Sequence, residues 1–536
     1  MNPEKNPERS SEKTPEKSSE SSSEKNSEKH CGKNSEKYCE KSSDNSSVKA
    51  SENRSDKNAE KVASSFRDPA GFVFSSQGAI YRQINNAGKE CYDLLLSSGL
   101  YDVLTKSGLL IRHEEAPIAA LEPALAYKII RPEPVPFISY PWEWSFSQLK
   151  DAALATLRIQ NVAIKHGMSL KDCSAFNIQF IASKPVFIDT LSFESYQEGM
   201  PWVAYRQFCQ HFLAPLALMS KCDIRLQQLW RANIDGIPLD MASRLLPLRT
   251  WLNFSLLTHL HLHAGSQSYF ADKAPASPSS PATSKVSRNA LLGIIDSLES
   301  GIRSQNYYPR GTEWGDYYAN TNYTDVSAEH KKTLLEEYFN KIGSQHLVWD
   351  LGANTGVFSQ IAARHSDVVV AFDIDPAAVE KNYLQSRDQQ VSNILPLLLD
   401  ITNPSPPVGW ENSERKSLLQ RGPADTVMAL ALIHHLAISN NLPLSHIAAL
   451  FAKICRNLII EFVPKSDSQV QKLLASRPDI FPDYHQAGFE LAFNKHFDVL
   501  SEEKVLDSQR NIYLYRTKCS LSGNFLMHNY DKKSGH

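Results

Sequence analysis

HLVWDLGANTGVFSQIAARHSDVVVAFDIDP, from His346 to Pro376, contains the pattern that decides the fold. Two apolar runs, Leu347–Leu351 and Val368–Ile374, carry aspartates near their ends, and a turn with two glycines lies between them. Continuous apolar runs are typical of buried parallel strands. We therefore predict a strand, a turn, a helix over Val357–Arg364 and a second strand. This is the unit from which doubly wound α/β sheets are built.

The turn Gly352–Gly356 indicates which ligand such a sheet would hold. Gly352 permits a tight turn, and Asn354 accepts a left-handed backbone more readily than most residues. No lysine follows as a P-loop requires, and Asn354 replaces the second glycine of a dinucleotide fingerprint. S-adenosylmethionine is the remaining class that we considered. It is cationic and carries a ribose diol, and both features suit carboxylates at strand ends.

The segment DLGANTG resembles the first motif, D/E-x-G-x-G-x-G, of class I S-adenosylmethionine-dependent methyltransferases. The resemblance covers residues 288–518 and implies a Rossmann-like seven-stranded sheet. It implies that Asp350 and the turn face the methionine portion of the cofactor, that Asp373 takes the ribose hydroxyls and that Asp400 lies beside the adenine. Asn354 stands where the family most often has glycine. The cofactor-binding residues expected from this resemblance are Asp350, Gly352, Ala353, Asn354, Gly356, Asp373, Asp400 and Ile401.

The rest of residues 288–518 continues the alternation of helix and strand patterns. A helix is predicted over residues 327–343, with a cap at Asp325 or Ser327 and an end at Gly343. Four more apolar runs are strand candidates. They are ILPLLLD (394–400), TVMALAL (426–432), NLIIEFV (457–463) and NIYLYRT (511–517).

Candidate catalytic residues follow the apolar run 426–432, which is the fourth strand candidate in chain order. His434 and His435 lie on the side where a methyl acceptor would bind, and histidine titrates near neutral pH, so either is a candidate general base. A core or pocket-lining role for these histidines is the alternative. We expect Glu461 to form a surface salt bridge and Asp375 to cap the following helix. The aromatic segment 307–325 could cover the cofactor, hold the acceptor or pack against the core.

The amino-terminal half contains a second, weaker motif. Asp172 and Asn177 have D-x-x-x-x-N spacing, and a hairpin-like pattern then ends at Asp189. This resembles the catalytic loop and metal-binding aspartate of protein-kinase-like and aminoglycoside-phosphotransferase-like folds. Under that resemblance Asn177 and Asp189 would hold a metal; otherwise no metal site is expected. The sequence shows no Gly-rich loop upstream, and Lys128 is the only candidate for the kinase lysine. The alternative is a helical accessory domain.

Composition divides the 536 residues into five parts. Residues 1–62 are a Lys/Glu/Ser tetrapeptide-repeat tail, which we expect to be disordered because it holds few apolar residues. Residues 63–270 are an α+β domain, 271–287 a Pro/Ser/Ala linker, 288–518 the methyltransferase-like domain and 519–536 a tail.

Bulk properties limit the location and the partners of the protein. The net charge of −2 gives no bias toward nucleic acid or an anionic membrane. No apolar stretch reaches the roughly 18 residues of a membrane span. The eight scattered cysteines favour reduced thiols in the cytoplasm.

The sequence therefore predicts a cytoplasmic methyltransferase that uses S-adenosylmethionine. The acceptor, whether a small molecule, a protein or a saccharide, and the oligomeric state stay open. The alternatives are a kinase-like nucleotide-binding or bifunctional protein and a non-catalytic cofactor-binding module.

Overall fold

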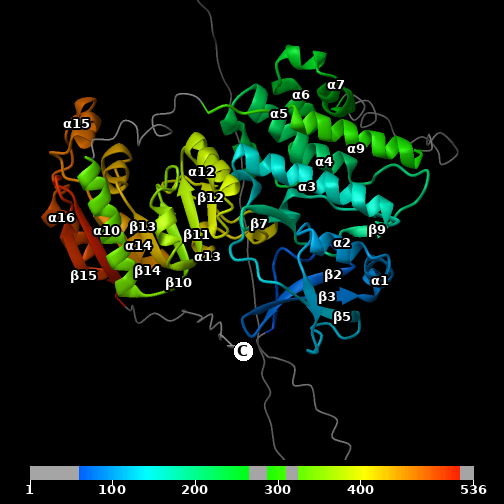
Figure 1. Cartoon of the computed structure of the whole chain (residues 1–536), viewed down its shortest axis with the longest axis horizontal. Coiled ribbons are helices and arrows are strands. Elements are labelled where there is room, and N and C mark those ends of the chain that lie inside the picture. Colours follow the sequence, from blue (N-terminus) through cyan, green and yellow to red (C-terminus); the bar gives the residue numbers. More distant parts are fainter. Residues whose placement is uncertain (1–58, 265–285, 310–323, 519–536) are drawn as a thin grey trace, which may run out of the picture. The chain divides into compact units, whose positions relative to one another are not determined.

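Two β-sheets organise the chain in the computed structural model (Figure 1). The structure describes residues 59–264, 286–309 and 324–518, all within the compact unit Arg54–His536. The predicted tails 1–62 and 519–536, apart from residues 59–62, lie outside these ranges. So do the linker 271–287, apart from residues 286 and 287, and most of the aromatic segment 307–325.

The carboxy-terminal half contains a seven-stranded sheet in the order β12-β11-β10-β13-β14-β16-β15. β16 runs antiparallel to both of its neighbours, and the other adjacent strands of this sheet pair in parallel. The strands are β10 (Gln345–Leu351), β11 (Ser366–Asp373), β12 (Ile394–Leu398), β13 (Ala424–Ala429), β14 (Cys455–Phe462), β15 (Phe497–Lys504) and β16 (Asn511–Thr517). The strand order reverses at β10, and such a switch point in an open sheet is where ligands bind.

Helices cover both faces of this sheet because neighbouring strand residues point to opposite sides. Val348 packs in one core with α10 and α11, whereas Trp349 packs in the other with α12, α14 and α16. The helices are α10 (Asp325–Ile342), α11 (Ser359–Ala362), α12 (Pro376–Asp388), α13 (Leu418–Arg421), α14 (Leu444–Ile454), α15 (Ser468–Ala475) and α16 (Gln486–Phe493). The mixed α/β, doubly covered sheet agrees with the predicted fold class.

Three details differ from the sequence prediction. Helix α11 is a single turn, because Val357 and Phe358 belong to the preceding turn instead of the helix. The cap of α10 is Thr324, whose side chain accepts a hydrogen bond from the Ser327 N–H, so neither predicted cap is correct. Gly343 does end α10, at a φ of 77°.

The amino-terminal half contains a five-stranded antiparallel sheet in the order β1-β2-β3-β5-β4. Its strands are β1 (Glu60–Lys61), β2 (Gly71–Ser76), β3 (Ala79–Asn85), β4 (His113–Glu115) and β5 (Ala126–Pro132). Helices α1 (Lys89–Ser97) and α2 (Leu100–Lys106) connect β3 to β4, with the left-handed Gly99 between them. The apolar pieces in residues 71–85 thus form two strands of this sheet.

A mostly helical region follows this sheet. The long α3 (Phe146–Lys165) starts at a Ser145 capping box. The other α-helices of this region are α4 (Tyr205–Phe208), α5 (Ala214–Lys221), α6 (Leu239–Leu245), α7 (Phe254–Leu256) and α9 (Arg288–Arg303). Two short antiparallel strand pairs accompany them: β6 (Met168–Leu170) with β9 (Phe193–Ser195), and the hairpin of β7 (Ile178–Ile181) with β8 (Lys184–Phe187). Helix α9 packs on α3 and α7, so the predicted boundary at residue 288 precedes a helix that adjoins the amino-terminal half.

The two halves share one apolar core. The Phe137 ring makes edge contacts with Trp349 of β10 and Phe372 of β11, at centroid distances of 6.0 and 6.1 Å. Phe180 of β7 similarly meets Tyr383 of α12 at 5.9 Å. The α12 face of the seven-stranded sheet is therefore covered partly by side chains from the amino-terminal half.

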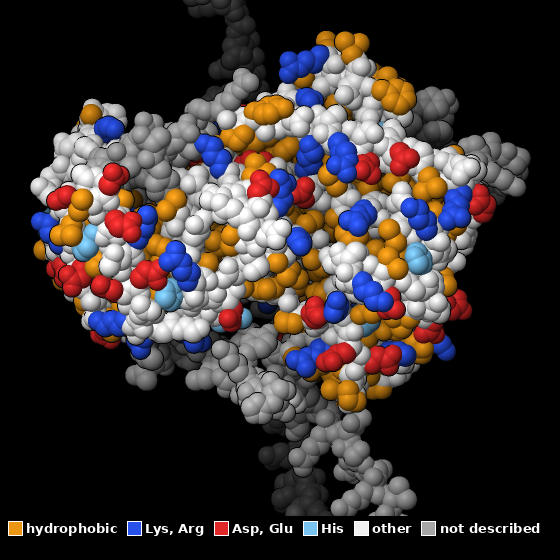
Figure 2. All heavy atoms as spheres, viewed as in Figure 1, with side chains coloured by type: hydrophobic (Ala, Val, Ile, Leu, Met, Phe, Trp, Pro, Cys, Tyr) orange, Lys and Arg blue, Asp and Glu red, His pale blue; other side chains and the backbone are white. Residues whose placement is uncertain are grey.

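Basic and acidic side chains are interspersed over the face shown in Figure 2. This face does not present one large patch of a single charge among its coloured residues, which accords with the small net charge. In the described part of the chain, every helix is too short or too polar to span a bilayer.

Gly356 provides a test of how the turn packs against the sheet. A Cβ at this position would lie 2.7 Å from the Asn382 side chain of α12, and φ is +85°. We expect Gly356→Ala to lower the free energy of unfolding by about 1–3 kcal/mol beyond the cost of the left-handed conformation. Urea denaturation measures this loss.

Gly343→Ala is the matched control, because φ is +77° there and nothing lies within 4 Å. Equal losses in the two variants would contradict close packing at Gly356.

Candidate cofactor site

The turn after β10 is built around three left-handed residues, Gly352, Asn354 and Gly356. Gly352 has a φ of 77° and Asn354 a φ of 52°, as expected for a residue that tolerates this conformation. The N–H groups of Gly352 and Ala353 both donate to the carbonyl of Phe372 at 2.9 Å. The turn is thus fastened across the ends of β10 and β11.

Asp350 lies beneath this turn and is almost completely buried. Its side chain accepts a hydrogen bond from the Ser359 hydroxyl at 2.6 Å. Burial raises the pKa of Asp350 to about 7, although Ser359 and the nearby Lys331 cation lower it. A cation that binds beside such a carboxyl group would stabilise its charged form.

Asp373 ends β11 and contacts the same turn. One carboxylate oxygen accepts the Asn354 N–H and the other accepts the Asp375 N–H, each at 2.8 Å. Burial raises the pKa of Asp373 to about 6 despite these hydrogen bonds. Each carboxylate oxygen has a second lone pair, so Asp373 can accept further hydrogen bonds.

Two further positions flank Asp373. Ile374 is 58% exposed, which is unusual for an apolar residue next to a buried carboxylate. Asp400 and Ile401 follow β12, the neighbour of β11, and Asp400 accepts hydrogen bonds from the Thr402 N–H and hydroxyl. Ile374 was not among the predicted cofactor-binding residues, although its place directly after the strand-end aspartate could have identified it.

The loop after β13 lies on the opposite side of the turn. A Cβ on Gly352 would lie 3.4 Å from Leu432, so this loop runs beside the turn. His434 and His435 follow, with ring centroids 4.1 Å apart. Burial lowers the pKa of His435 to about 4 and that of His434 well below its ordinary value. Both imidazoles are therefore neutral at pH 7, and within the described residues His434 Nδ1 has no hydrogen-bond partner.

A chain of buried ion pairs adjoins the histidines. Lys331 Nζ lies 2.6 Å from Glu461, Arg510 lies 3.5 Å from the other oxygen of Glu461, and Arg510 also pairs with Asp467 at 2.8 Å. Glu461 is fully buried, so the prediction of a surface salt bridge is wrong. Lys331 and Arg510 were not identified from the sequence because they come from α10 and from the turn before β16. No local pattern joins these two positions.

Two other polar residues act as helix caps. The Asp375 carboxylate accepts the Ala377 N–H at 2.8 Å, and its role as a cap was predicted. His485, which is exposed, caps α16 by accepting the Gly488 N–H at 3.0 Å. The cap accounts for one Asp375 oxygen, whereas the other is buried and has no hydrogen-bond partner among the described residues.

The chemistry of the turn fits S-adenosylmethionine. Two buried carboxyl groups with raised pKa values suit a cationic ligand with hydroxyl donors, and the exposed Ile374 offers an apolar surface beside them. Gly356 serves a different purpose, because its missing side chain makes room for Asn382. The structure thus brings Asp350, the turn and Asp373 together, and places Asp400 on the adjacent strand.

The kinase-like motif forms a separate polar cluster in the amino-terminal half. Asp189 follows the β7–β8 hairpin and pairs with Arg82 of β3, so the cation facing Asp189 is Arg82. Lys128 instead pairs with Glu115. Burial would raise the pKa of Asp189, but Arg82 and hydrogen bonds from Ser192 and the Leu191 N–H hold it below its ordinary value.

The other two motif residues also have partners within the protein. Asp172 accepts hydrogen bonds from the Ser174 N–H and from Gln207, and Asn177 donates to Ser192. Over residues 59–264, 286–309 and 324–518, the structure contains no group of three His, Cys, Asp or Glu side chains arranged to hold a metal ion. Metal binding by Asn177 and Asp189 stays a prediction that depends on the kinase-like hypothesis.

Comparison with known proteins identifies the family. No family model matches the chain. The chain is 34% identical over 464 residues to nodulation protein NoeA of Rhizobium meliloti (strain 1021), and this alignment covers 85% of the chain and 96% of NoeA. The chain belongs to the NoeA family. An alignment of this length includes residues from both halves of the chain.

Several solved methyltransferases are more distantly similar to this NoeA relative. N-methyltransferase NodS from Bradyrhizobium japonicum WM9 is 11% identical, with 36% of this chain and 97% of NodS covered at a TM-score of 0.26. Magnesium protoporphyrin IX methyltransferase (ChlM) from Synechocystis PCC 6803, with bound SAH, is 16% identical, with 38% and 93% covered at 0.27. TM-scores this low do not establish the fold, which is therefore assigned from the strand order of the chain itself.

The burial of Asp350 predicts a measurable dependence of stability on pH. Its pKa is higher in the folded protein than in the unfolded chain, so the folded state holds the proton more tightly. The stability of the ligand-free protein should therefore fall as pH rises from about 4 to about 7. Asp350→Asn should raise the free energy of unfolding at pH 8, by on the order of 1–3 kcal/mol, and flatten this dependence.

Thermal denaturation between pH 5 and pH 8 tests this expectation. Asp507→Asn, at an exposed position in the same half, is the control. A lower melting temperature for Asp350→Asn at pH 8 would show that the charged form of Asp350 stabilises the fold.

Proposed function

We propose that this NoeA-family protein is a methyltransferase that uses S-adenosylmethionine. The observation that carries this proposal is the pair of buried carboxyl groups, Asp350 and Asp373, at the ends of adjacent parallel strands around the left-handed turn 352–356. The pair lies at the switch point of a doubly covered seven-stranded sheet, where ligands of open α/β sheets bind.

Each part of the turn has a distinct role in this proposal. Asp373 accepts hydrogen bonds from the two ribose hydroxyls, and Ile374 contacts the nucleoside from beside it. Asp350 provides negative charge toward the methionine portion, and the backbone from Gly352 to Asn354 lines the same side. Asp400 and Ile401 border the adenine. When bound, the cofactor supplies an electrophilic methyl group on a sulfonium.

The loop after β13 provides the acceptor side. An acceptor that loses a proton during methylation needs a base, and a neutral imidazole can take that proton. His434 and His435 are both neutral at pH 7 and lie beyond Leu432, next to the turn. We assign one of them as the candidate base. A small molecule, a protein side chain and a saccharide are all candidate acceptors.

We place the reaction in the cytosol. The described cysteines, which are Cys91, Cys173, Cys209, Cys222 and Cys455, are all free thiols. Reduced thiols support this compartment, because oxidising compartments favour disulfides.

Binding of the demethylated product, S-adenosylhomocysteine, tests the cofactor site directly. Asp373→Asn should weaken binding to the full chain by roughly 10–100-fold, because a carboxylate that accepts two hydroxyl hydrogen bonds is replaced by a neutral amide. Isothermal titration calorimetry measures this change. Asp367→Asn, at the other and exposed end of β11, is the matched control and should bind like the wild type. Absence of binding to the wild-type chain would refute the proposal.

The raised pKa values predict proton release on binding. Asp350 and Asp373 are partly protonated between pH 6 and pH 7, and a bound cation favours their charged forms. Affinity for S-adenosylmethionine should therefore rise with pH across this range, and protons should be released to the buffer. Calorimetry in buffers of different ionisation enthalpy counts these protons. Asp350→Asn should reduce the number released, and an unchanged number would contradict the role of Asp350.

Catalysis requires a separate test. Incubation of the full chain with methyl-labelled cofactor and fractionated cell lysate should transfer label to one size and chemical class of acceptor. Binding of the cofactor without transfer to any fraction would instead favour a non-catalytic binding module.

A further inference from the structure

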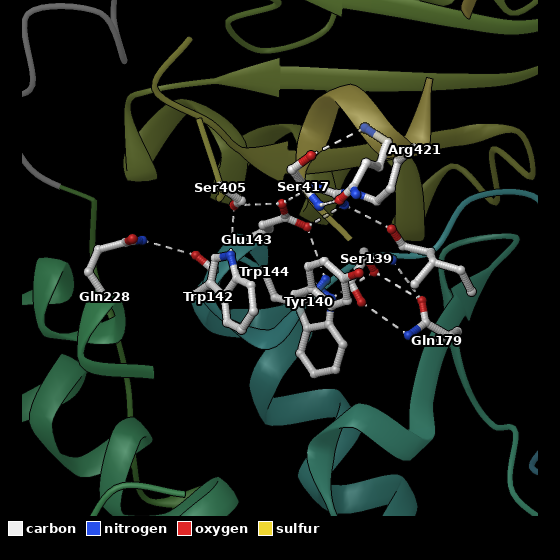
Figure 3. A network of polar contacts seen from close by, with 12 residues as sticks. Ser139, Tyr140, Trp142, Glu143, Trp144, Gln179, Gln228, Ser405, Ser417 and Arg421 are labelled. Carbon is white, nitrogen blue, oxygen red and sulfur yellow. Dashed lines mark hydrogen bonds and ion pairs between the residues drawn. The ribbon is translucent and has the colours of Figure 1, made fainter. Parts of the chain in front are cut away.

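A buried polar network connects the amino-terminal half to the loop after β12 (Figure 3). The short helix η2 (Pro141–Glu143) lies between β5 and α3, and the loop of residues 399–423 connects β12 to β13. The Trp142 indole N–H donates to Ser405 Oγ at 2.8 Å, and the Ser405 hydroxyl donates to Glu143 at 3.1 Å. These two side chains of η2 thus hold the middle of the loop.

Glu143 is the centre of this network. It is 1% exposed, and Arg421 donates to both of its carboxylate oxygens, one of them at 2.9 Å. The Tyr140 N–H also donates to Glu143, at 3.0 Å. The Arg421 guanidinium lies over the rings of Tyr140 and Phe137, at 4.8 and 5.0 Å from their centroids. Both charges of this pair are therefore buried and face each other, although Arg421 Nε has no hydrogen-bond partner among the described residues.

The same loop begins at the cofactor site. The Leu399 N–H donates to the carbonyl of Asp373, which joins the start of the loop to the end of β11. The Asn403 N–H donates to the carbonyl of Asp400 and closes a turn that Thr402 also stabilises. Ser405 follows two residues later. The positions of Asp400 and Ile401 are therefore fixed on one side by β11 and on the other by Glu143.

A buried ion pair of this kind adds more to conformational specificity than to net stability. The cost of removing two charges from water offsets much of their attraction, but the pair tolerates few alternative arrangements. The Glu143–Arg421 pair joins a short helix of one half to helix α13 at the end of the loop. It therefore restricts the arrangements of this loop, to which the Arg67–Glu414 ion pair is a further link from the amino-terminal half.

We infer that Glu143 is a positioning residue for the adenine side of the cofactor site. It holds the loop of residues 399–421 so that Asp400 and Ile401 stand beside Asp373. This inference rests on the proposed function, since it assigns the adenine to Asp400 and Ile401. It adds a role for the amino-terminal half, which completes one wall of the cofactor site without touching the cofactor.

Glu143→Gln provides the test, because glutamine keeps the shape of the side chain and removes its charge. The readout is the ratio of affinities for S-adenosylhomocysteine and S-inosylhomocysteine, which differ only at the purine 6-position. We expect the variant to bind S-adenosylhomocysteine about tenfold more weakly and to lose most of the wild-type discrimination between the two compounds. Calorimetry on the full chain measures both affinities.

Glu380→Gln is the matched control. Glu380 of α12 is also buried, at 2% exposed, and accepts hydrogen bonds from the Ser147 N–H and hydroxyl across the two halves. Among the described residues its hydrogen bonds go to Ser147, and none goes to the loop of residues 399–421. Glu380→Gln should therefore keep the wild-type discrimination ratio. An equal loss of discrimination in both variants would show that Glu143 only holds the halves together, and would overturn the inference.

A second variant covers the case in which Glu143→Gln does not fold. Ser405→Ala removes the hydroxyl that links Trp142 and Glu143 but leaves the charge pair in place. It should reduce the discrimination ratio by about threefold with little change in melting temperature. An unchanged ratio in Ser405→Ala would refute the positioning role. Failure of the proposed function is recognised separately, because the wild-type chain would then bind neither compound.

Discussion

The structure of the site depends on one constraint: two carboxyl groups are kept out of water beside a backbone turn that needs left-handed residues. Asp373 accepts the N–H of Asn354, so the turn and the end of β11 hold each other in place. Gly352 and Asn354 supply the positive φ angles that let the chain reverse over Asp350. Burial disfavours the charged forms of both aspartates, which leaves the site with electrostatic energy that a cationic ligand can recover.

The sequence predicted the buried strands of the carboxy-terminal half well and its exposed edge strand poorly. The buried strands are continuous apolar runs, so β10 to β14 and β16 could be located from the sequence. Strand β15 escaped notice because an edge strand with the sequence FDVLSEEK is mostly exposed and charged. The left-handed Asn354 and the cap at Asp375 were accessible because both depend on neighbouring residues only.

Features that depend on distant residues could not be predicted. Glu461 looks like a surface residue in its local sequence, yet Lys331 and Arg510 enclose it from positions 130 and 49 residues away. Glu143 and Arg421 are separated by 278 residues. In the amino-terminal half, the D-x-x-x-x-N motif and the hairpin were visible, but the Arg82–Asp189 pair required the fold of the five-stranded sheet. These pairs are specified by topology, which periodicity and motif spacing do not encode.

The aromatic contacts of Phe137 with β10 and β11 have a practical consequence for dissecting this protein. A fragment that begins after the predicted linker would lack Phe137, which covers the rings of Trp349 and Phe372, and Glu143, which pairs with Arg421. Exposed aromatic surface of this kind promotes self-association. Although the chain reads as two consecutive domains, expression of the carboxy-terminal half alone should give an aggregating product, and the segment around residues 137–146 would have to be retained to obtain a well-behaved one.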